Sequence, residues 1–281
     1  MKKNLLFLVH RIPFPPNKGD KIRSFNMLLQ LSDKYNVYLA GFIDRDEDWQ
    51  YVDDLRKYCS DVYFRPVRRW RSKFYAALYL LTGRSLSVGF YSHKALGKWV
   101  ENAARNVHFD AAVSFSSSMT QFLPYNLLKE PVIVADFVDL DSDKWSQYAE
   151  EVKWPMSSVY RYEAKALAKW EMDTVELVDV VTLVSSAERD LLLKRRGEKS
   201  GKIKVVRNGV DTQFFDPSIE FDNPYEPGKR IAVFTGAMDY FANVQGVQWF
   251  AEEIWPTVKK VVPMAEFWIV GSKPTNEVKA L

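Results

Sequence analysis

The sequence predicts an α/β fold that begins with a doubly wound parallel sheet. Nine apolar runs have the length of strands, and they are continuous rather than alternating, as in parallel strands that are buried on both faces. Helix-like segments lie between these runs, so strands and helices alternate along the chain. The predicted strands are residues 5–9, 37–42, 62–65, 111–115, 132–135, 180–184, 203–206, 231–234 and 266–270.

The segments between the strands have the lengths of helices. Residues 145–177 are a long stretch for a single helix, and Pro155 is expected to break it or to start a new helix, because proline lacks the backbone N–H that a helix interior needs. The helices are predicted at residues 20–33, 47–58, 92–106, 145–177, 186–196 and 244–260.

A proline-rich stretch marks the predicted boundary between two domains. Residues 216–229 carry three prolines and one glycine and show no helical period. We therefore expect a complete first domain over residues 1–215, a linker at 216–229, and a second domain at 230–281. The second domain has room for one strand, one helix and one more strand, so it is expected to be truncated.

Composition favours a folded protein of the cytoplasm. The apolar fraction is 47% and the formal charge is +3, which supports a real core and disfavours a general nucleic-acid binder. The single cysteine, Cys59, rules out an internal disulfide and fits a reducing compartment. The apolar run at 5–9 is too short for a signal peptide, and no run approaches the roughly 20 residues that span a bilayer.

The turn after the first strand, residues 10–23, is the first candidate site. Ligands of open α/β sheets bind beyond the carboxyl ends of the strands, and Gly19 precedes a helix whose first amides could meet an anion. Arg23 adds positive charge. The glycine pattern is not a dinucleotide fingerprint, which weighs against a nicotinamide oxidoreductase. A rigid proline loop is an equal alternative, and His10 by itself is more often structural than catalytic.

Four aspartates follow the predicted strand at 132–135. Carboxylates at the end of a strand can accept hydrogen bonds from substrate hydroxyls, bind a cation or act as a base. Asp143 is expected to cap a helix that begins near Lys144, and capping explains one or two of the four. The spacing is not that of a calcium-binding EF-hand loop. The aspartates are Asp136, Asp139, Asp141 and Asp143.

Two further turns contain small polar residues. Residues 114–120 are rich in serine, and capping of the next helix is the default interpretation over ligand contact. No nucleophile elbow is present there, which disfavours a serine hydrolase. In the second domain, Gly236 permits close approach of a ligand, and Asn243 is expected to cap the helix at 244.

A basic stretch next to an apolar and aromatic run predicts contact with an anionic membrane surface. Cations at residues 65–73 would meet lipid headgroups, while aromatic side chains at 70–81 would settle at the interface. A solvated basic loop leading into a core helix is the alternative, and a groove for single-stranded nucleic acid is less favoured. The membrane-facing residues are predicted to be Arg68, Arg69, Trp70, Arg71 and Lys73.

The chain resembles a known family along its whole length through an ordered set of motifs. It is similar to the GT-B glycosyltransferases of family 4, and most similar to the sugar transferases of bacterial PEP-CTERM/exosortase exopolysaccharide systems. The motifs are His-Arg-Ile-Pro-Phe-Pro-Pro-Asn-Lys-Gly-Asp-Lys-Ile-Arg at 10–23, Ser-Ser-Ser-Met at 116–119, Asp-Phe-Val-Asp-Leu-Asp-Ser-Asp-Lys-Trp-Ser-Gln-Tyr-Ala at 136–149, Asn-Gly-Val-Asp at 208–211, Phe-Thr-Gly-Ala-Met-Asp-Tyr-Phe-Ala-Asn at 234–243 and Ile-Val-Gly-Ser-Lys-Pro at 269–274.

The resemblance implies two Rossmann-like domains, the first binding the acceptor and the second the nucleotide-sugar. It implies a retaining transferase with no metal and no cofactor apart from the nucleotide-sugar substrate. The implied catalytic residues are Asp136 and Asp139. The implied donor or phosphate contacts are Gly19, Asp20, Arg23, Gly236 and Asn243. The implied acceptor contacts are Ser116, Ser117, Asp141 and Lys144.

The chain departs from the family pattern in its second domain. Family 4 donor domains carry a Glu-x7-Glu element downstream of the strand that ends here at Gly271, and Asp239 and Asn243 stand where the family has an arginine and a lysine. The exposed sheet edges of a half-domain would favour a homodimer. The expected function is sugar transfer to a lipid-linked exopolysaccharide precursor at the membrane. The alternative is a non-catalytic module that binds a glycolipid or a partner.

Overall fold

The computed structural model describes residues 2–128, 130–197 and 201–281, and the chain forms two compact units, Met1–Gly209 and Val210–Leu281. The division falls shortly before the predicted linker at 216–229. Residues 206–229 contain neither helix nor strand. Each unit is described by itself.

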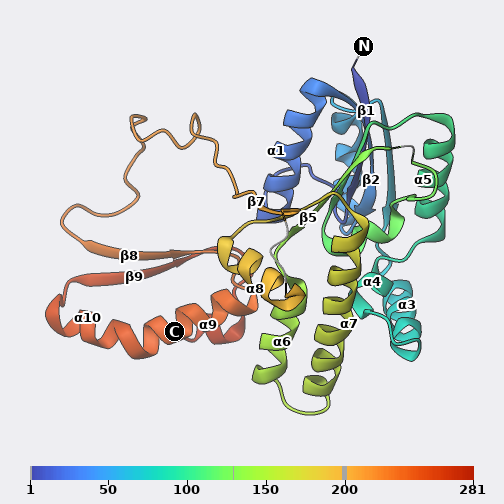
Figure 1. Ribbon diagram of the computed structural model, residues 1–281. Coiled ribbons are helices and arrows are strands. Elements are labelled where there is room, and N and C mark those ends of the chain that lie inside the picture. Colours follow the sequence, from blue (N-terminus) through green and yellow to red (C-terminus); the bar gives the residue numbers. More distant parts are fainter. Residues whose placement is uncertain (1, 129, 198–200) are drawn as a thin grey trace. The chain divides into compact units, whose positions relative to one another are not determined.

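The first unit is built on a seven-stranded parallel sheet with the order β3-β2-β1-β4-β5-β6-β7. The chain moves outward from β1 to one edge, returns to lay β4 beside β1, and then proceeds to the other edge (Figure 1). This reversal between β1 and β4 is the topological switch point of a Rossmann-like sheet. The strands are β1 (Lys3–Val9), β2 (Tyr35–Ile43), β3 (Asp61–Pro66), β4 (Ala111–Phe115), β5 (Val132–Val138), β6 (Val180–Leu183) and β7 (Ile203–Val205).

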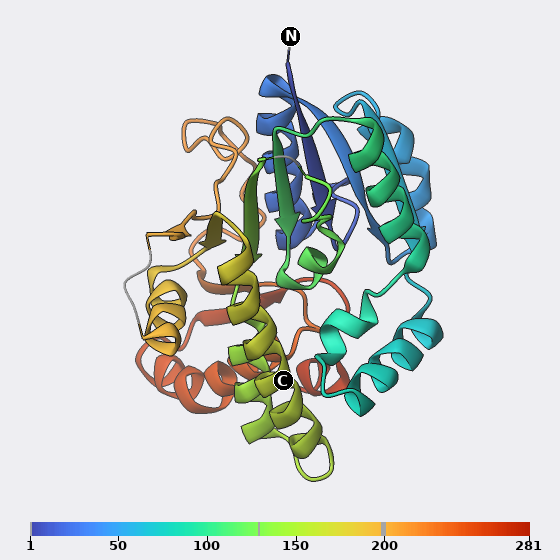
Figure 2. The same cartoon turned by 45° about the vertical axis from the view of Figure 1, so that its right-hand side comes forward.

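Helices cover both faces of the sheet (Figure 2). Successive residues of β1 point to opposite faces: Leu6 and Leu8 join one core cluster, while Leu5 and Phe7 join the other. The helical elements are α1 (Gly19–Lys34), the 3-10 helix η1 (Asp46–Tyr51), α2 (Val52–Leu55), α3 (Arg69–Leu81), α4 (Leu86–Phe90), α5 (Lys94–Asn106), the 3-10 helix η2 (Ser117–Phe122), α6 (Asp141–Glu151), α7 (Met156–Leu177) and α8 (Ser186–Arg196).

The second unit pairs two parallel strands, β8 (Arg230–Thr235) and β9 (Ala265–Val270). Its small core contains Met238, Val247 and Val278. A Cβ on Gly271 would lie 1.7 Å from the carbonyl oxygen of Gly236, so only glycine fits where the two strands end. The helices are α9 (Phe241–Trp249), a π-helical turn (Phe250–Ile254), α10 (Trp255–Val261) and α11 (Asn276–Lys279).

All nine predicted strands are confirmed, and so is the break at Pro155, which separates α6 from α7. The prediction of one helix at 47–58 is wrong, because a 3-10 helix precedes one short α-turn there. Asp48 in this 3-10 helix pairs with Lys21 of α1 at 2.7 Å. Helices α4 and α11 were missed, and α3 is absent from the predicted helices, although the alternative interpretation of residues 65–81 includes a helix there. No helix in the described part of the chain is both long and apolar enough to cross a bilayer.

Candidate functional site

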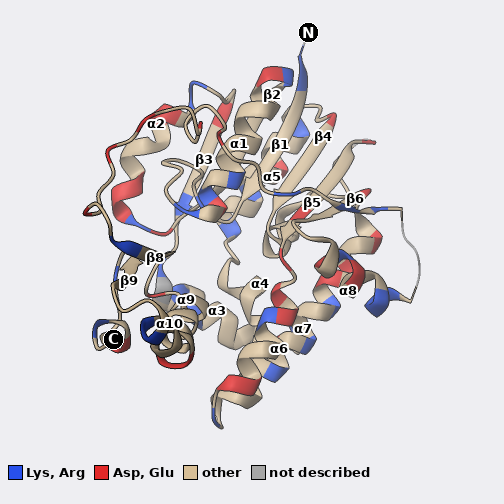
Figure 3. Ribbon diagram, turned by 90° about the vertical axis from the view of Figure 1, so that its left-hand side faces the viewer, with Lys and Arg blue, Asp and Glu red and all other residues tan. Residues whose placement is uncertain are grey.

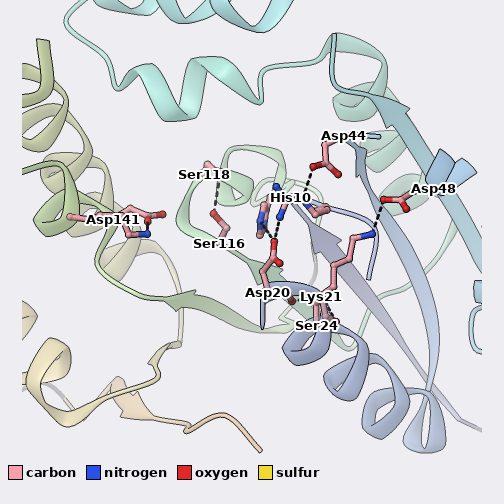
Figure 4. A network of polar contacts seen from close by, with 11 residues as sticks. His10, Asp20, Lys21, Ser24, Asp44, Asp48, Ser116, Ser118 and Asp141 are labelled. Carbon is pink, nitrogen blue, oxygen red and sulfur yellow. Dashed lines mark hydrogen bonds and ion pairs between the residues drawn. The ribbon is translucent and has the colours of Figure 1, made fainter. Parts of the chain in front are cut away.

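The carboxyl ends of β1, β4 and β5 place three sequence motifs at one edge of the sheet. Strand β1 leads into His10, β4 leads into Ser116, and β5 contains Asp136. In open α/β sheets this edge, at the switch point, is where ligands bind. Figure 4 shows polar side chains that gather there, and we call this region the switch-point site. The labelled residues of the site are His10, Asp20, Lys21, Ser24, Asp44, Asp48, Ser116, Ser118 and Asp141.

Asp20, on the first turn of α1, receives two side chains from the loop after β1 (Figure 4). His10 Nε2 lies 3.4 Å from Asp20 Oδ2, and an Arg11 guanidinium nitrogen donates to the same oxygen. Burial would raise the pKa of the Asp20 carboxyl, but the hydrogen bond from His10 and the charge of Arg11 outweigh it and hold that pKa well below its ordinary value. Asp20 is therefore a fixed anion.

The imidazole of His10 is held by its surroundings. Its ring stacks on Phe115, at a centroid distance of 5.6 Å and an interplanar angle of 4°. Nε2 faces Asp20, and Nδ1 is buried without a hydrogen-bond partner among the described residues. This arrangement favours the tautomer in which Nε2 carries the proton and donates it to the carboxylate.

A buried ion pair joins α1 to β5. Arg23 donates from Nε and Nη2 to the two oxygens of Asp136, at 2.8 and 3.0 Å. Asp136 is 0% exposed and also accepts from the hydroxyl of Thr182 at 2.7 Å. The remaining guanidinium nitrogen of Arg23 donates to Asn208 Oδ1 at 2.9 Å. One arginine thus ties together the 10–23, 136–149 and 208–211 motifs.

A second buried pair anchors the same helix. Lys21 Nζ lies 2.7 Å from Asp48 Oδ2, and both side chains are almost fully buried (Figure 4). The first turns of α1 therefore hold three neighbouring residues, Asp20, Lys21 and Arg23, each in a separate ionic contact. These contacts fix the start of the helix, and with it Gly19, against the sheet.

Two residues with left-handed backbone conformations lie at adjacent strand ends. Ser116 has φ of 83° and ψ of 139°, and Val138 has φ of 68°. Such φ values are uncommon for residues with a side chain, and most of all for a β-branched one. The Ser116 N–H donates to the carbonyl of Asp136, two residues before Val138, at 2.8 Å. Backbone strain of this kind concentrates at functional sites.

Replacing Ser116 by glycine is expected to give a protein that is more stable than the alanine variant by about 1–2 kcal/mol. Both substitutions remove the hydroxyl, so their difference isolates the cost of the left-handed φ. Urea unfolding of Ser116→Gly and Ser116→Ala measures it. Equal stabilities, or a less stable glycine variant, would show that Ser116 is not strained.

The remaining predicted acceptor residues also lie at this edge. Ser116 Oγ and Ser118 Oγ are 3.0 Å apart, and Asp141 Oδ1 lies 2.9 Å from Lys144 Nζ (Figure 4). Ser117 is buried, and its carbonyl accepts from the indole of Trp170 at 2.9 Å. Ser116, Asp141 and Lys144 are open enough to meet sugar hydroxyls. Ser117 and Ser118 are buried, and their visible role is structural.

Asp139 differs from Asp136 in its surroundings. It is only partly buried, and no side-chain hydrogen bond holds it among the described contacts. Burial, followed by the nearby charge of Glu188, raises the pKa of its carboxyl. Asp139 is thus a carboxyl with access to a ligand, whereas both oxygens of Asp136 are engaged. The catalytic roles expected of the two aspartates stay predictions.

Three capping predictions are wrong. Helix α6 begins at Asp141 rather than near Lys144, and Asp143 lies inside it, with Oδ1 2.9 Å from Arg195 Nη2. Aspartates in the first turn suit the helix dipole without capping. Helix α9 begins before Asn243, whose amide instead donates to the carbonyl of Ala237 at 3.0 Å and closes the turn after β8. The side chain of Ser116 makes no capping bond to η2.

The predicted membrane-facing residues lie at the start of α3. Arg68, Trp70, Arg71 and Lys73 are exposed, and the side chain of Arg69 lies outside the described part of the structure. Trp70 is 70% exposed and Leu81 is 82% exposed, so the alternative of a core helix is wrong for these side chains. Acidic and basic segments mix along α6, α7 and α8 (Figure 3). By contrast, every charged residue within 65–73 is an arginine or a lysine.

The sequence did not single out three polar residues that take part in the ionic contacts of the switch-point site. Arg11, Asp44 and Asp48 belong to the ionic contacts of the switch-point site, and only their places after strands β1 and β2 hint at this. Among the described residues, no three His, Cys, Asp or Glu side chains are grouped so as to hold a metal ion.

The comparisons with known proteins rest on structure alone. Neither a protein-family model nor a curated protein sequence matches the chain. UGT2 of Phytolacca americana, complexed with UDP-2fluoro-glucose and pterostilbene, has a TM-score of 0.54 and 11% identity, and the match covers 97% of this chain and 72% of that one. An α,α-trehalose-phosphate synthase (UDP-forming) from Burkholderia vietnamiensis has a TM-score of 0.50 and 13% identity, and the match covers 100% of this chain and 66% of that one.

The N-terminal domain of trehalose-6-phosphate phosphatase from Candida albicans gives a TM-score of 0.53 at 10% identity, over 100% of this chain and 66% of that one. The chain thus spans about two thirds of the length of these proteins. At such low identity the likeness shows the fold. The chain has the α/β architecture of the Rossmann-like domains of GT-B enzymes.

Proposed function

We propose that the protein is a glycosyltransferase of family 4 that moves a sugar from a nucleotide-sugar to a lipid-linked exopolysaccharide precursor. The fold supports the general reaction, because two proteins that share it are a UDP-forming synthase and an enzyme crystallised with a UDP-sugar. The order of the sequence motifs supports the family, the retaining outcome and the kind of acceptor.

The observation that carries the proposal is the convergence of three motifs on Arg23. The 10–23 and 136–149 motifs meet in the Arg23–Asp136 ion pair, and Asn208 of the Asn-Gly-Val-Asp motif joins them. Segments separated by more than a hundred residues are therefore held together at one edge of the sheet, where the proposal places the ligand. The buried Arg23–Asp136 pair fixes α1 against β5 at this edge of the sheet.

The proposal gives Asp136 and Asp139 different roles. Asp136 is a positioning residue, because its bonds to Arg23 and Thr182 leave it no free oxygen. Asp139 is the group proposed to exchange a proton with the acceptor hydroxyl, since a raised pKa brings a carboxyl closer to neutrality. Ser116, Asp141 and Lys144 would bind acceptor hydroxyls, and Gly236 and Asn243 would lie at the donor phosphates.

The acceptor is proposed to reach the site from a membrane surface. Helix α3 offers exposed apolar side chains at Trp70, Phe74 and Leu81, next to the cations at 65–73. Large apolar side chains beside a basic stretch are the pattern of a peripheral membrane contact. The protein is therefore proposed to work at the inner face of the membrane. No helix in the described chain is long and apolar enough to span a bilayer.

The test is sugar transfer by the full-length protein that its gene encodes. Labelled UDP-, GDP- and dTDP-sugars are each incubated with the protein and with lipid extracted from its host membranes. We expect label to enter the lipid fraction from one class of donor. Failure to bind any nucleotide-sugar would overturn the proposal. Binding to lipid vesicles with neither transfer nor hydrolysis of a nucleotide-sugar would favour the alternative, a non-catalytic glycolipid-binding module.

A further inference from the structure

A small cavity beside the carboxyl end of β3 is lined by cations and lies apart from the switch-point site. It has a volume of about 190 Å³ and is bounded by the end of β3, the first turns of α3 and the segment before α5. We call it the arginine cavity. Its polar lining consists of Arg65, Arg68, Arg71, Ser72, Tyr75, Ser92 and His93.

The arginine cavity holds positive charge without a counter-charge. Among the residues that the structure describes, three arginines line it, and no aspartate or glutamate does. Elsewhere in the unit, arginines such as Arg11 and Arg23 pair with buried or half-buried carboxylates. Among the described contacts, none of the three cavity arginines forms an ion pair.

Two buried nitrogen atoms at the cavity lack partners. Arg65 Nε and His93 Nδ1 are both buried and have no hydrogen-bond partner among the described residues. Leaving such groups unpaired costs free energy, and each one in a native fold calls for an explanation. A bound anion that accepts hydrogen bonds would supply it.

The surroundings of His93 point the same way. Burial, and then the charges of Arg65 and Arg71, lower the pKa of the His93 imidazole. Three groups that can carry positive charge are thus held close enough to repel one another. An anion between them would turn this repulsion into attraction.

The N-terminus of helix α3 adds to the positive electrostatic potential of the arginine cavity. Helix α3 has 13 residues and begins at Arg69, and the Arg68 side chain makes no capping bond. The first N–H groups of a helix have no intrahelical partners and carry partial positive charge, which makes this end suitable for a phosphate. The same turn supplies Arg68 and Arg71 to the cavity.

We propose that the arginine cavity binds a phosphate or diphosphate group. Its volume is below the range of pockets that enclose a whole small-molecule ligand, but it can take an anionic head. Arginine guanidinium groups suit phosphate because they donate paired hydrogen bonds to its oxygens.

The phosphate belongs to a membrane lipid. Trp70, Phe74 and Leu81 are exposed on α3, whose N-cap Arg68 and first-turn Arg71 line the cavity, so a phosphate bound there would have its hydrocarbon chain beside an apolar helix. A larger cavity of about 770 Å³ shares Ser92 and His93 with the arginine cavity and includes Lys94 and Trp170. It offers room for sugar residues attached to that phosphate. This choice of ligand rests on the proposed function, whereas phosphate binding does not.

The test compares cations on one helix. Arg71→Gln and Arg68→Gln remove cavity arginines, and Lys73→Gln removes an exposed cation of α3 that does not line the cavity. Each change lowers the net charge by the same amount. Sedimentation measures binding to phosphatidylcholine vesicles that contain a polyprenyl phosphate or, at matched surface charge, phosphatidylglycerol. Calorimetry measures binding of inorganic pyrophosphate, and circular dichroism melting confirms that each variant is folded.

We expect the native protein to prefer polyprenyl phosphate vesicles, and Arg71→Gln to weaken that binding about tenfold or more, as for a lost charge-assisted hydrogen bond. Lys73→Gln should weaken binding to both vesicles by only about twofold. Equal losses in all three variants, with no preference between vesicles and no pyrophosphate binding, would overturn the proposal. Pyrophosphate binding that Arg71→Gln abolishes, without a preference for the polyprenyl lipid, would uphold the phosphate site and overturn its lipid source.

Discussion

Replacing Arg23 by methionine is expected to lower the free energy of unfolding by about 3–5 kcal/mol, because it leaves the Asp136 carboxylate buried without its counter-charge. Asp136 is 0% exposed, and Arg23 supplies two of its hydrogen bonds. Methionine keeps most of the side-chain volume, so the loss reports the charge rather than a cavity. Urea unfolding monitored by circular dichroism measures the change.

Two control variants separate this effect from a general loss of charge. Arg56 pairs with Asp53 at 3.2 Å, but its side chain is 57% exposed. Arg56→Met should therefore cost less than about 1 kcal/mol. The double variant Arg23→Met with Asp136→Leu should recover part of the stability, because neither charge is then buried alone. A loss for Arg23→Met no larger than that for Arg56→Met would contradict the structural role given to the ion pair.

The second large effect is a pH dependence of stability that arises from Glu171. This residue of α7 is 0% exposed, and it accepts from the backbone N–H of Ser142 at 3.1 Å and from the hydroxyl of the same serine. Burial raises the pKa of its carboxyl from 4.5 to about 7, against the hydrogen bonds from Ser142 and the charge of Arg195, which lower it. The folded protein therefore keeps the Glu171 proton to a higher pH than the unfolded chain does.

The sign of the effect follows from proton linkage. Between about pH 4.5 and pH 7 the folded state binds more protons than the unfolded state, so this group's contribution is greatest below pH 4.5 and is lost as the pH rises through 7. The loss amounts to about 3 kcal/mol. Glutamine retains the shape and an acceptor oxygen but does not titrate. The stability difference between the native protein and Glu171→Gln should therefore move by about 3 kcal/mol in favour of the variant from pH 4.5 to pH 8.

Glu176 provides the matched control for this experiment. It lies on the same helix, but its side chain is 61% exposed and pairs with Arg196 at the surface. Glu176→Gln should leave the pH dependence of unfolding close to that of the native protein. Parallel stability–pH curves for the native protein and Glu171→Gln would show that burial does not shift Glu171.

The strands were predictable because their surroundings are simple. Strand β1 packs Leu6 and Leu8 into one core and Leu5 and Phe7 into the other, and burial on both faces produces a continuous apolar run that the sequence displays directly. The helix boundaries were less predictable. Helix α6 begins at Asp141, with Asp141 and Asp143 in its first turn. The capping pattern instead predicts a start near Lys144 with Asp143 as the cap.

The pairing of side chains was beyond reach of the sequence. Arg23 and Asp136 are separated by 113 residues, and only the register of β1, β4 and β5 brings them together. The basic stretch at 65–73 was visible as a charge run, but local spacing does not reveal that Arg65 and Arg71 converge with His93 on one cavity. Patterns of period two or 3.6 report burial, whereas sites depend on contacts between distant segments.

The transfer assay with the Asp139 and Asp136 variants tests the central claim most directly. The full-length protein should move labelled sugar from one nucleotide-sugar class into the lipid fraction. Asp139→Asn should slow transfer about a hundredfold or more without loss of stability, as expected for a group that exchanges a proton with the acceptor. Asp136→Asn should act mainly by weakening the fold. No transfer from any nucleotide-sugar, or unchanged transfer by a folded Asp139→Asn variant, would contradict this account.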